Sequence, residues 1–443
     1  MRPTVDSGPA AEPTSRRRRG PAGGLSEGLS LSLAGAVGSF AGFISWLIAA
    51  RIMPQEAVGY ASAFVSGFLL VAGAAQLNLD AALMLWLPRA GRRAPTLLWR
   101  SYRVILPICI LVGLVYVAVV PSLARTAAGP DGPIALGIIL FVIAAAGWGL
   151  WGVHDYALLA IGRTWWAPWR NVTFALVRIG LLVALGASFG AQGIVLSWVI
   201  PIVVWTVGSL LLVRSFTGQF ARAATTSWMP KRTEVFSFLG PTTIGHLGTV
   251  LLSNQVTLLV IQFYGPEPGA AFFIAWQAVL VIDITANRFM QPLSAHLARE
   301  PERAKEHVDA SRRRLLIIFL PVLAIGMVLA EKGLQIFGPG YAQAATVLRV
   351  LLVGLAFRLL IAHELGRRQA LSDGMGFARL QLVSTLLVIG VVIFIPVGDP
   401  GPSGTYSVES LVPVALGYTA VQMLCAATIL LMPFVRGIRA RMA

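Results

Sequence analysis

The sequence is poor in charge, and most of the charge that it carries is arginine. Only 12% of its 443 residues are charged and 56% are hydrophobic, whereas an ordinary soluble domain is about 25% charged. Three lysines stand among 35 basic residues, and 19 acidic residues leave a formal net charge of +16. Because so few charged residues cannot form the surface of a soluble protein, the composition predicts an integral membrane protein.

Cysteine is also scarce, and the usual signatures of catalysis are missing. The two cysteines, Cys109 and Cys425, both lie inside long apolar runs, which excludes a disulfide framework and a cysteine metal site. The sequence has no phosphate-cradling glycine loop, no Ser/His/Asp order at a strand-to-helix turn and no metal-ligand spacing. We therefore expect no enzymatic activity, no metal and no cofactor.

Long apolar runs are what the sequence has in abundance. A helix needs about 20 residues to cross the hydrocarbon of a bilayer. On that measure the chain is predicted to be all-α with twelve transmembrane helices. They are 29–50, 57–86, 104–124, 134–160, 171–189, 191–213, 236–263, 269–292, 315–336, 342–362, 380–396 and 410–433.

The basic residues alternate in a way that fixes the orientation. With both termini on the cytoplasmic side, 29 basic residues fall on that side and three on the other (Arg51, Arg125 and Lys332). The last three, Arg178, Arg349 and Arg358, fall within predicted helices. An excess of Lys and Arg in cytoplasmic loops is the rule in membrane proteins. Because the charge lies in short loops between apolar runs, it does not indicate nucleic-acid binding.

Prolines repeat at a nearly constant interval. Pro54 and Pro266 are 212 residues apart, as are Pro201 and Pro413, and Pro107 and Pro321 are 214 apart. The interval predicts two parallel six-helix bundles, with binding sites between them near the midplane. The expected division is a disordered basic tail 1–28, a bundle 29–213, a linker 214–235, a bundle 236–433 and a basic tail 434–443.

Ionisable side chains inside a membrane are costly and therefore mark candidate functional sites. A guanidinium suits phosphate recognition, so Arg178 is a candidate substrate ligand, with snorkelling to the interface as the alternative. Arg349 and Arg358 are nine residues apart and point to opposite sides of one helix. Arg358 is near the cytoplasmic end and is expected to snorkel, which leaves Arg349 as the candidate.

One predicted helix carries a polar stripe. Thr242, His246, Thr249, Ser253 and Thr257 share one helical face, with Asn254 beside it. Such a stripe faces a wet cavity or a packed partner helix, and we favour the cavity. The candidate substrate ligands are therefore Arg178, His246, Asn254, Arg288 and Arg349.

Three acidic residues lie in or near the predicted spans. Asp283 is placed to bond Asn287 or to lie near Arg288, whereas Asp80 and Asp155 are near cytoplasmic ends and are expected to be solvated. Each is a candidate for ion or proton coupling, although no spacing forms a recognisable cation site.

Several segments, in order along 25–435, resemble the polysaccharide-transporter branch of the MATE-like (multidrug/oligosaccharidyl-lipid/polysaccharide) flippase superfamily. They are Ala50 to Ala61, Leu87-Pro88-Arg89, Leu158 to Arg163, Arg170-Asn171-Val172, Gln291 to Ser294 and Phe337 to Arg349. The resemblance implies two six-helix bundles in a V around a central cavity, and outward flipping of polyprenyl-diphosphate-linked glycans by alternating access. The chain departs from the family at Val256-Thr257 and Leu85-Trp86, where charged residues are usual, so its cavity is expected to be less charged.

The leading hypothesis is a monomeric flippase for a lipid-linked oligosaccharide in a bacterial cell membrane, for cell-surface polysaccharide synthesis. Its expected partners are the lipid-linked glycan, membrane lipids and a polysaccharide polymerase or glycosyltransferases, with no nucleic acid. Two alternatives stay open. An ion-coupled exporter of a small molecule or secondary metabolite would depend on an acidic residue such as Asp283, and a membrane scaffold would tolerate loss of every candidate residue.

Overall fold

The computed structural model describes residues 38, 41–290, 293, 301–397, 400 and 405–442. The tail 1–28, most of 29–40 and nearly all of the Gln291 to Ser294 motif lie outside the described residues.

The described chain is helical almost throughout. A helix over Ala41–Ile52 precedes the labelled elements. These are α2 (Gln55–Gln76), α3 (Leu79–Ala90), α4 (Ala94–Val119), α5 (Pro121–Ala128), α6 (Ile134–Ala160), α7 (Trp166–Ala223), α8 (Arg232–Tyr264), α9 (Pro266–Phe289), α11 (Ala304–Gln335), α12 (Pro339–Ala342), α13 (Ala345–Ala370), α14 (Gly374–Phe394) and α15 (Val412–Met442), with 3-10 turns at Pro301–Arg303 and Val408–Leu411.

Ten of the described helices are long and apolar enough to cross a membrane. One of them, α7, has 58 residues and breaks at Gly190, whose φ of 53° and ψ of −128° are not helical. Its two parts run antiparallel, because Phe174 packs against Trp198 and Arg170 contacts Ser209 across the break. A left-handed backbone there requires glycine, and the predicted break between Phe189 and Ala191 is confirmed.

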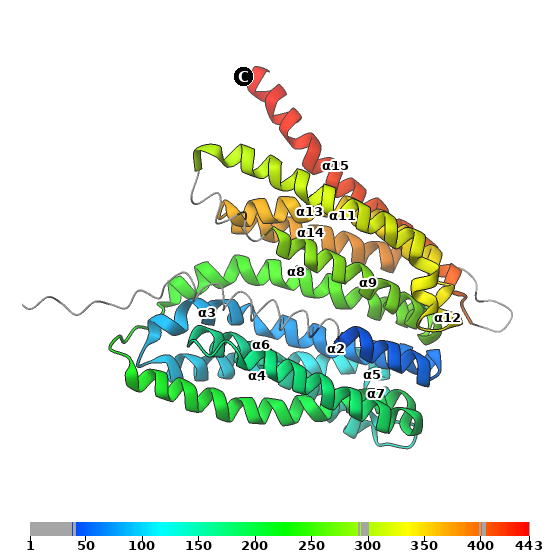
Figure 1. Ribbon diagram of the computed structural model, residues 1–443, viewed down its shortest axis with the longest axis horizontal. Helices are drawn as coiled ribbons and strands as arrows, with labels where there is room; N and C mark the ends of the chain where they lie inside the picture. The colour runs from blue at the N-terminus through cyan, green and yellow to red at the C-terminus, as the bar shows by residue number, and fades with distance from the viewer. Residues whose placement is uncertain are drawn as a thin grey trace, which may run out of the picture.

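The helices lie side by side in two halves, α2–α7 and α8–α15 (Figure 1). The connections α3–α4, α6–α7, α7–α8 and α13–α14 lie at one end of the molecule, and α5 and α12 lie at the other. The first end carries the arginine-rich loops and is called the basic end here; the second is called the distal end. Successive connections thus lie at opposite ends, which agrees with the charge pattern along the sequence. The cytoplasmic assignment of the basic end stays a prediction. The twelve-helix count and the two six-helix bundles stay predictions as well.

Two of the segments predicted to lie outside the spans are helical in large part. The predicted linker 214–235 is mostly helical, because α7 continues to Ala223 and α8 begins at Arg232. The predicted tail 434–443 is helical up to Met442 as the end of α15. Hydropathy predicts only the part of a helix that lies in the hydrocarbon. A helix can extend beyond that part into water, because its backbone hydrogen bonds are made within the helix itself.

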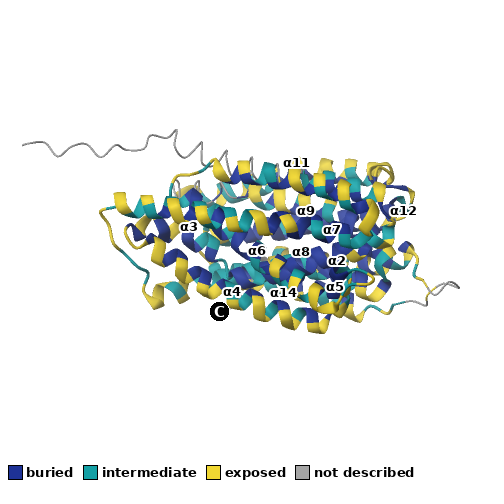
Figure 2. Cartoon of the chain, turned by 90° about the horizontal axis from the view of Figure 1, so that it is seen from below, coloured by how far each residue is buried: buried dark blue, intermediate teal, exposed yellow. Residues whose placement is uncertain are grey.

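Buried residues face inward along the bundle, and exposed residues follow its outside (Figure 2). Many exposed side chains are large and apolar, among them Leu111, Val204 and Val328. Apolar residues on the outside of a helical bundle, where every backbone group bonds within its own helix, fit contact with lipid.

The paired prolines lie in or next to helices of the two halves. Pro54 precedes α2 and Pro266 begins α9. Pro107 and Pro321 lie inside α4 and α11, and Pro201 and Pro413 lie in α7 and α15. The first two pairs therefore lie at comparable points of their helices, whereas Pro201 lies well inside the second part of α7 and Pro413 is the second residue of α15.

Candidate functional site

The two halves are tightly packed together at the distal end. The side chain of Gln55 at the start of α2 donates from Nε2 to the backbone oxygen of Glu267, at 2.8 Å. One turn on, Gly59 lies so close to Pro266 that a Cβ would overlap its carbonyl oxygen. The Arg51 Nε also donates to the Ile336 oxygen at 2.6 Å. The two proline turns that repeat along the sequence thus pack directly against each other.

Two further polar contacts join the halves near this end. The Tyr116 hydroxyl of α4 donates to Gln255 Oε1 of α8 at 2.7 Å. Gln262 Nε2 donates to the Ser122 hydroxyl at 3.0 Å. Together with the contacts of α2 and α9, these bonds close the distal end.

Toward the basic end, α2 and α8 stay in contact. His246 Nε2 lies 3.1 Å from the Gly73 oxygen, and the Thr243 hydroxyl donates to the Leu77 oxygen at 2.7 Å. A Cβ on Gly73 would lie 2.8 Å from Val250. Close backbone approach through a small residue is the usual packing mode of membrane helices.

The central helix α9 changes character along its length. All residues from 268 to 276 are buried, in the distal half. In the basic half one face is exposed, comprising Ala278, Val281, Ile284, Thr285 and Arg288; it is called the open α9 face here. In α2, residues 61–68 are likewise all buried, whereas Leu69, Gly73 and Leu77 are partly exposed. The halves are therefore closed at the distal end and less covered toward the basic end.

Arg288 on the open α9 face lies near charged groups of the other half. The electrostatic surroundings of the Tyr156 hydroxyl on α6 include both Arg288 and Asp80. Asp80 is partly exposed at the start of α3 and accepts a bond from the Ala81 amide at 2.9 Å. Of the five candidate ligands, His246 contacts the other half directly, and Arg288 is exposed on the open α9 face.

The polar stripe of α8 divides between several environments. His246 contacts α2, Thr249 is exposed, and Thr257 is buried. Asn254 donates to the Val250 oxygen of its own helix at 3.0 Å. Part of the stripe therefore packs against neighbouring helices, as at His246 and Thr257, and part of it is exposed, as at Thr249.

Arg178 lies inside the first half. Its side chain is 5% exposed, and its guanidinium stacks on the Trp198 ring at 3.7 Å. Its Nε has no hydrogen-bond partner within the described part of the chain. The snorkelling alternative is wrong, because the antiparallel return of α7 brings Trp198 over this arginine and holds it by a cation–π interaction.

The expectation that Arg358 snorkels is also wrong. Its side chain is 3% exposed, and its Nε lies 3.2 Å from Asp283 Oδ1, while Nη2 donates to Gln381 Oε1 at 3.4 Å. Arg349 points elsewhere: it is 42% exposed, lies 3.8 Å from Glu331 and bonds the Met327 oxygen on α11. The structure therefore places Arg349 away from the interface of the two halves.

A second buried ion pair lies in the first half. Arg170 Nη2 is 2.6 Å from Asp155 Oδ1 and also donates to the Trp151 oxygen at 2.9 Å. Its guanidinium stacks on the Trp151 ring at 3.8 Å. The expectation that Asp155 is solvated is wrong, because α6 and α7 enclose it, leaving its side chain 16% exposed. No sequence signal pairs these residues beyond their opposite charge.

The buried charges leave a surplus of arginine. Asp155 and Asp283 are each neutralised by an arginine, and Arg178 has no carboxylate partner within the described residues. The described residues contain no group of three or more potential metal ligands. Within the described interior, an arginine rather than a carboxylate is therefore left without an ion-pair partner.

No protein-family model and no curated protein sequence matches the chain, but solved structures share its fold. The inward-facing conformation of a multidrug resistance MATE family transporter of the MOP superfamily aligns with a TM-score of 0.65 at 16% identity, over 93% of this chain and 98% of that one. The lipid II flippase MurJ in an inward closed conformation aligns with a TM-score of 0.66 at 13% identity, over 92% of this chain and 87% of that one.

A third structure is a MOP superfamily transporter from Pyrococcus furiosus, described as having a binding pocket of reverse polarity. It aligns with a TM-score of 0.62 at 16% identity, over 94% of this chain and 95% of that one. The chain therefore has the fold of the MATE-like superfamily, and the resemblance inferred from its motifs is confirmed at the level of the fold.

Proposed function

We propose that the chain is a transporter that carries a polyprenyl-diphosphate-linked oligosaccharide from the inner to the outer leaflet of a bacterial cell membrane by alternating access. The observation that supports this most is the charge balance inside the protein. Asp155 and Asp283 are each held in an ion pair, whereas Arg178 has no carboxylate partner among the described residues and Arg288 is exposed on the open α9 face.

The physical chemistry of such a substrate fits this arrangement. A diphosphate needs guanidinium partners, and a long isoprenoid tail remains favourable in lipid while the headgroup crosses. If the basic end is cytoplasmic, the open α9 face is on the side where such lipids are made. Outward movement of an anion then gains about 2.3 kcal/mol per charge per 100 mV of membrane potential.

The exporter alternative has less support from the geometry. It needs a carboxylate that exchanges a proton or cation during transport, and Asp283 was its main candidate. In the structure this carboxylate is already held in an ion pair with Arg358, so it is not free to bind a transported cation. The likeness to a lipid II flippase adds to the case for a lipid-linked substrate.

Deletion of the gene tests the proposal directly. We expect one polyprenyl-diphosphate glycan to accumulate in lipid extracts analysed by mass spectrometry, and the wild-type gene to reverse this. Arg288→Ala is expected to lower the rate of translocation about tenfold or more, because it removes a charge-assisted bond to phosphate. Arg349→Ala is the matched control, since it removes an exposed arginine that lies away from the interface.

Two results would contradict the proposal. An unchanged lipid profile with a small metabolite retained in the cells would indicate the exporter. Equal transport by the Arg288→Ala and Arg349→Ala variants would remove the role of the open α9 face. Arg178→Ala is a less clean test, because it leaves a gap over the Trp198 ring in addition to removing a charge.

A further inference from the structure

A second polar site lies at the basic end of the α8–α15 half, outside the interface of the two halves. A cavity of about 470 Å³ is formed there between α11, α13, α14 and α15. Its lining contains no residue of α2, α8 or α9. The site is therefore separate from the open α9 face.

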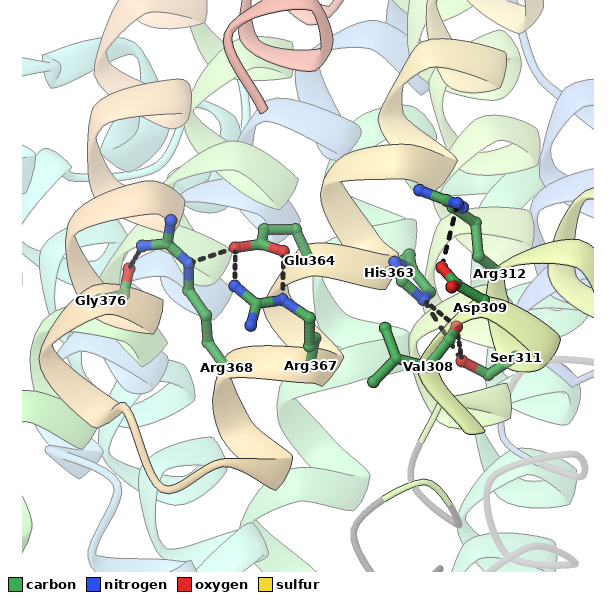
Figure 3. Close-up of polar contacts among 9 residues, drawn as sticks. All are labelled: Val308, Asp309, Ser311, Arg312, His363, Glu364, Arg367, Arg368 and Gly376. Atoms are coloured by element: carbon green, nitrogen blue, oxygen red, sulfur yellow. Dashed lines mark hydrogen bonds and ion pairs between the residues drawn. The ribbon is translucent and has the colours of Figure 1, made fainter. Parts of the chain in front are cut away.

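The polar side of this cavity is rich in arginine. Its lining contains Arg312, Arg367 and Arg368 against one carboxylate, Glu364. Glu364 lies between its two neighbouring arginines (Figure 3) and accepts from Arg367 Nε and Nη2 at 2.7 Å and from Arg368 Nε at 2.8 Å. This arrangement fixes two guanidinium groups in place and leaves the cavity with an excess of positive charge.

Several donors of these arginines stay free. Arg368 also donates from Nη1 to the Gly376 oxygen at 2.7 Å, and Arg312 Nη2 bonds Asp309 at 3.1 Å. Arg312 Nη1, Arg367 Nη1 and Arg368 Nη2 carry no hydrogen bond within the described part of the chain. His363 Nε2 lies 3.1 Å from the Val308 oxygen, which ties α13 to α11 beside the cavity.

The other side of the cavity is apolar and continues to the lipid-facing surface. It is lined by Leu360, Leu380, Ile429 and Leu430. Leu430 and its neighbour Leu431 are 48% and 59% exposed on α15. An anion-binding end next to an exposed apolar wall matches a molecule with a charged headgroup and a hydrocarbon tail.

We propose that this cavity binds an anionic phospholipid of the leaflet at the basic end. The headgroup would lie against the arginines of the lining, with its phosphate on the free guanidinium donors of Arg312, and one acyl chain would lie along Leu430 and Leu431. Basic pockets between transmembrane helices on the cytoplasmic side are typical headgroup sites, and a guanidinium fork matches a phosphate in geometry. The bound lipid would link α11 and α13 to α15.

The test is lipid binding to the purified full-length chain in detergent, measured by native mass spectrometry. The probes are phosphatidylglycerol, phosphatidylcholine of the same chain length, and glycerol 3-phosphate without acyl chains. We expect phosphatidylglycerol to bind more tightly than either of the others. Arg312→Ala should weaken its binding about tenfold, because one charge-assisted contact is lost.

Arg313→Ala is the matched control, because Arg313 is the exposed neighbour of Arg312 on α11 and does not line the cavity. It should leave binding unchanged. Equal loss in both variants would show attraction to a diffuse basic surface and overturn the proposal. Equal binding of phosphatidylcholine, or binding of glycerol 3-phosphate as tight as that of the lipid, would overturn it too. If Arg312→Ala does not fold, Arg312→Lys decides, since it keeps the charge and removes the fork.

Discussion

Gly59→Ala is expected to open the distal end of the protein. The new Cβ would overlap the Pro266 carbonyl oxygen, and neither backbone can move without separating α2 from α9. Overpacking of this kind costs about 1–3 kcal/mol, which shifts the ratio of closed to open molecules about 5- to 150-fold. Transport should fall as well, because a chain that cannot close this end cannot complete alternating access.

The opening can be measured as a distance between spin labels. Val119 at the end of α4 and Val328 on α11 are 74% and 78% exposed and lie in different halves near the distal end. Cysteines at these two positions, in a chain whose buried Cys109 and Cys425 are replaced, would report a longer distance for Gly59→Ala. Gly208→Ala is the control, because a Cβ there meets nothing within 4 Å. Identical distances in the wild type and in Gly59→Ala would show that the contact between Gly59 and Pro266 does not hold the distal end closed.

Asp283→Ala is expected to destabilise the second half strongly. It leaves Arg358, whose side chain is 3% exposed, without its carboxylate. Removing one partner of a buried ion pair costs about 3–5 kcal/mol, because the other charge stays buried and unpaired. The free energy of unfolding, or the melting temperature in detergent, should fall accordingly.

The control is Glu331→Ala, which breaks the exposed pair with Arg349 at 3.8 Å. Exposed pairs contribute about 0–1 kcal/mol, so this variant should melt close to the wild type. The double variant Asp283→Leu with Arg358→Met should recover part of the loss, because it buries no unpaired charge. A melting temperature of Asp283→Ala equal to that of Glu331→Ala would show that the pair does not hold α9 to α13.

Much of the architecture could be predicted because it depends on short stretches of sequence. An apolar run of about 20 residues is enough to predict a spanning helix, whichever helices surround it. The turn at Gly190 was predictable for the same reason, since a residue without a side chain separates two apolar runs there. The proline interval likewise marked equivalent points, such as Pro54 and Pro266, in the two halves.

The partners of the charged side chains were not predictable in this way. Asp283 was expected to bond within its own helix, and its partner Arg358 lies 75 residues away on α13. Asp155 was expected to be solvated, and it forms a buried ion pair with Arg170 between α6 and α7. Their burial depends on which helices pack beside them, which helical periodicity does not specify.

The sequence by itself therefore determined that the chain is a helical membrane protein, where most of its helices run, which loops share an end and which superfamily its fold resembles. Each of these depends on local hydropathy, on turn residues or on the order of charges along the chain. The tertiary structure alone decided that the halves close at Gly59 and Pro266, that Arg178 stacks on Trp198 and that Arg349 lies away from the interface. Those facts depend on contacts between helices that are distant in sequence. Rotating or sliding one helix by a single residue would change which side chains it contacts.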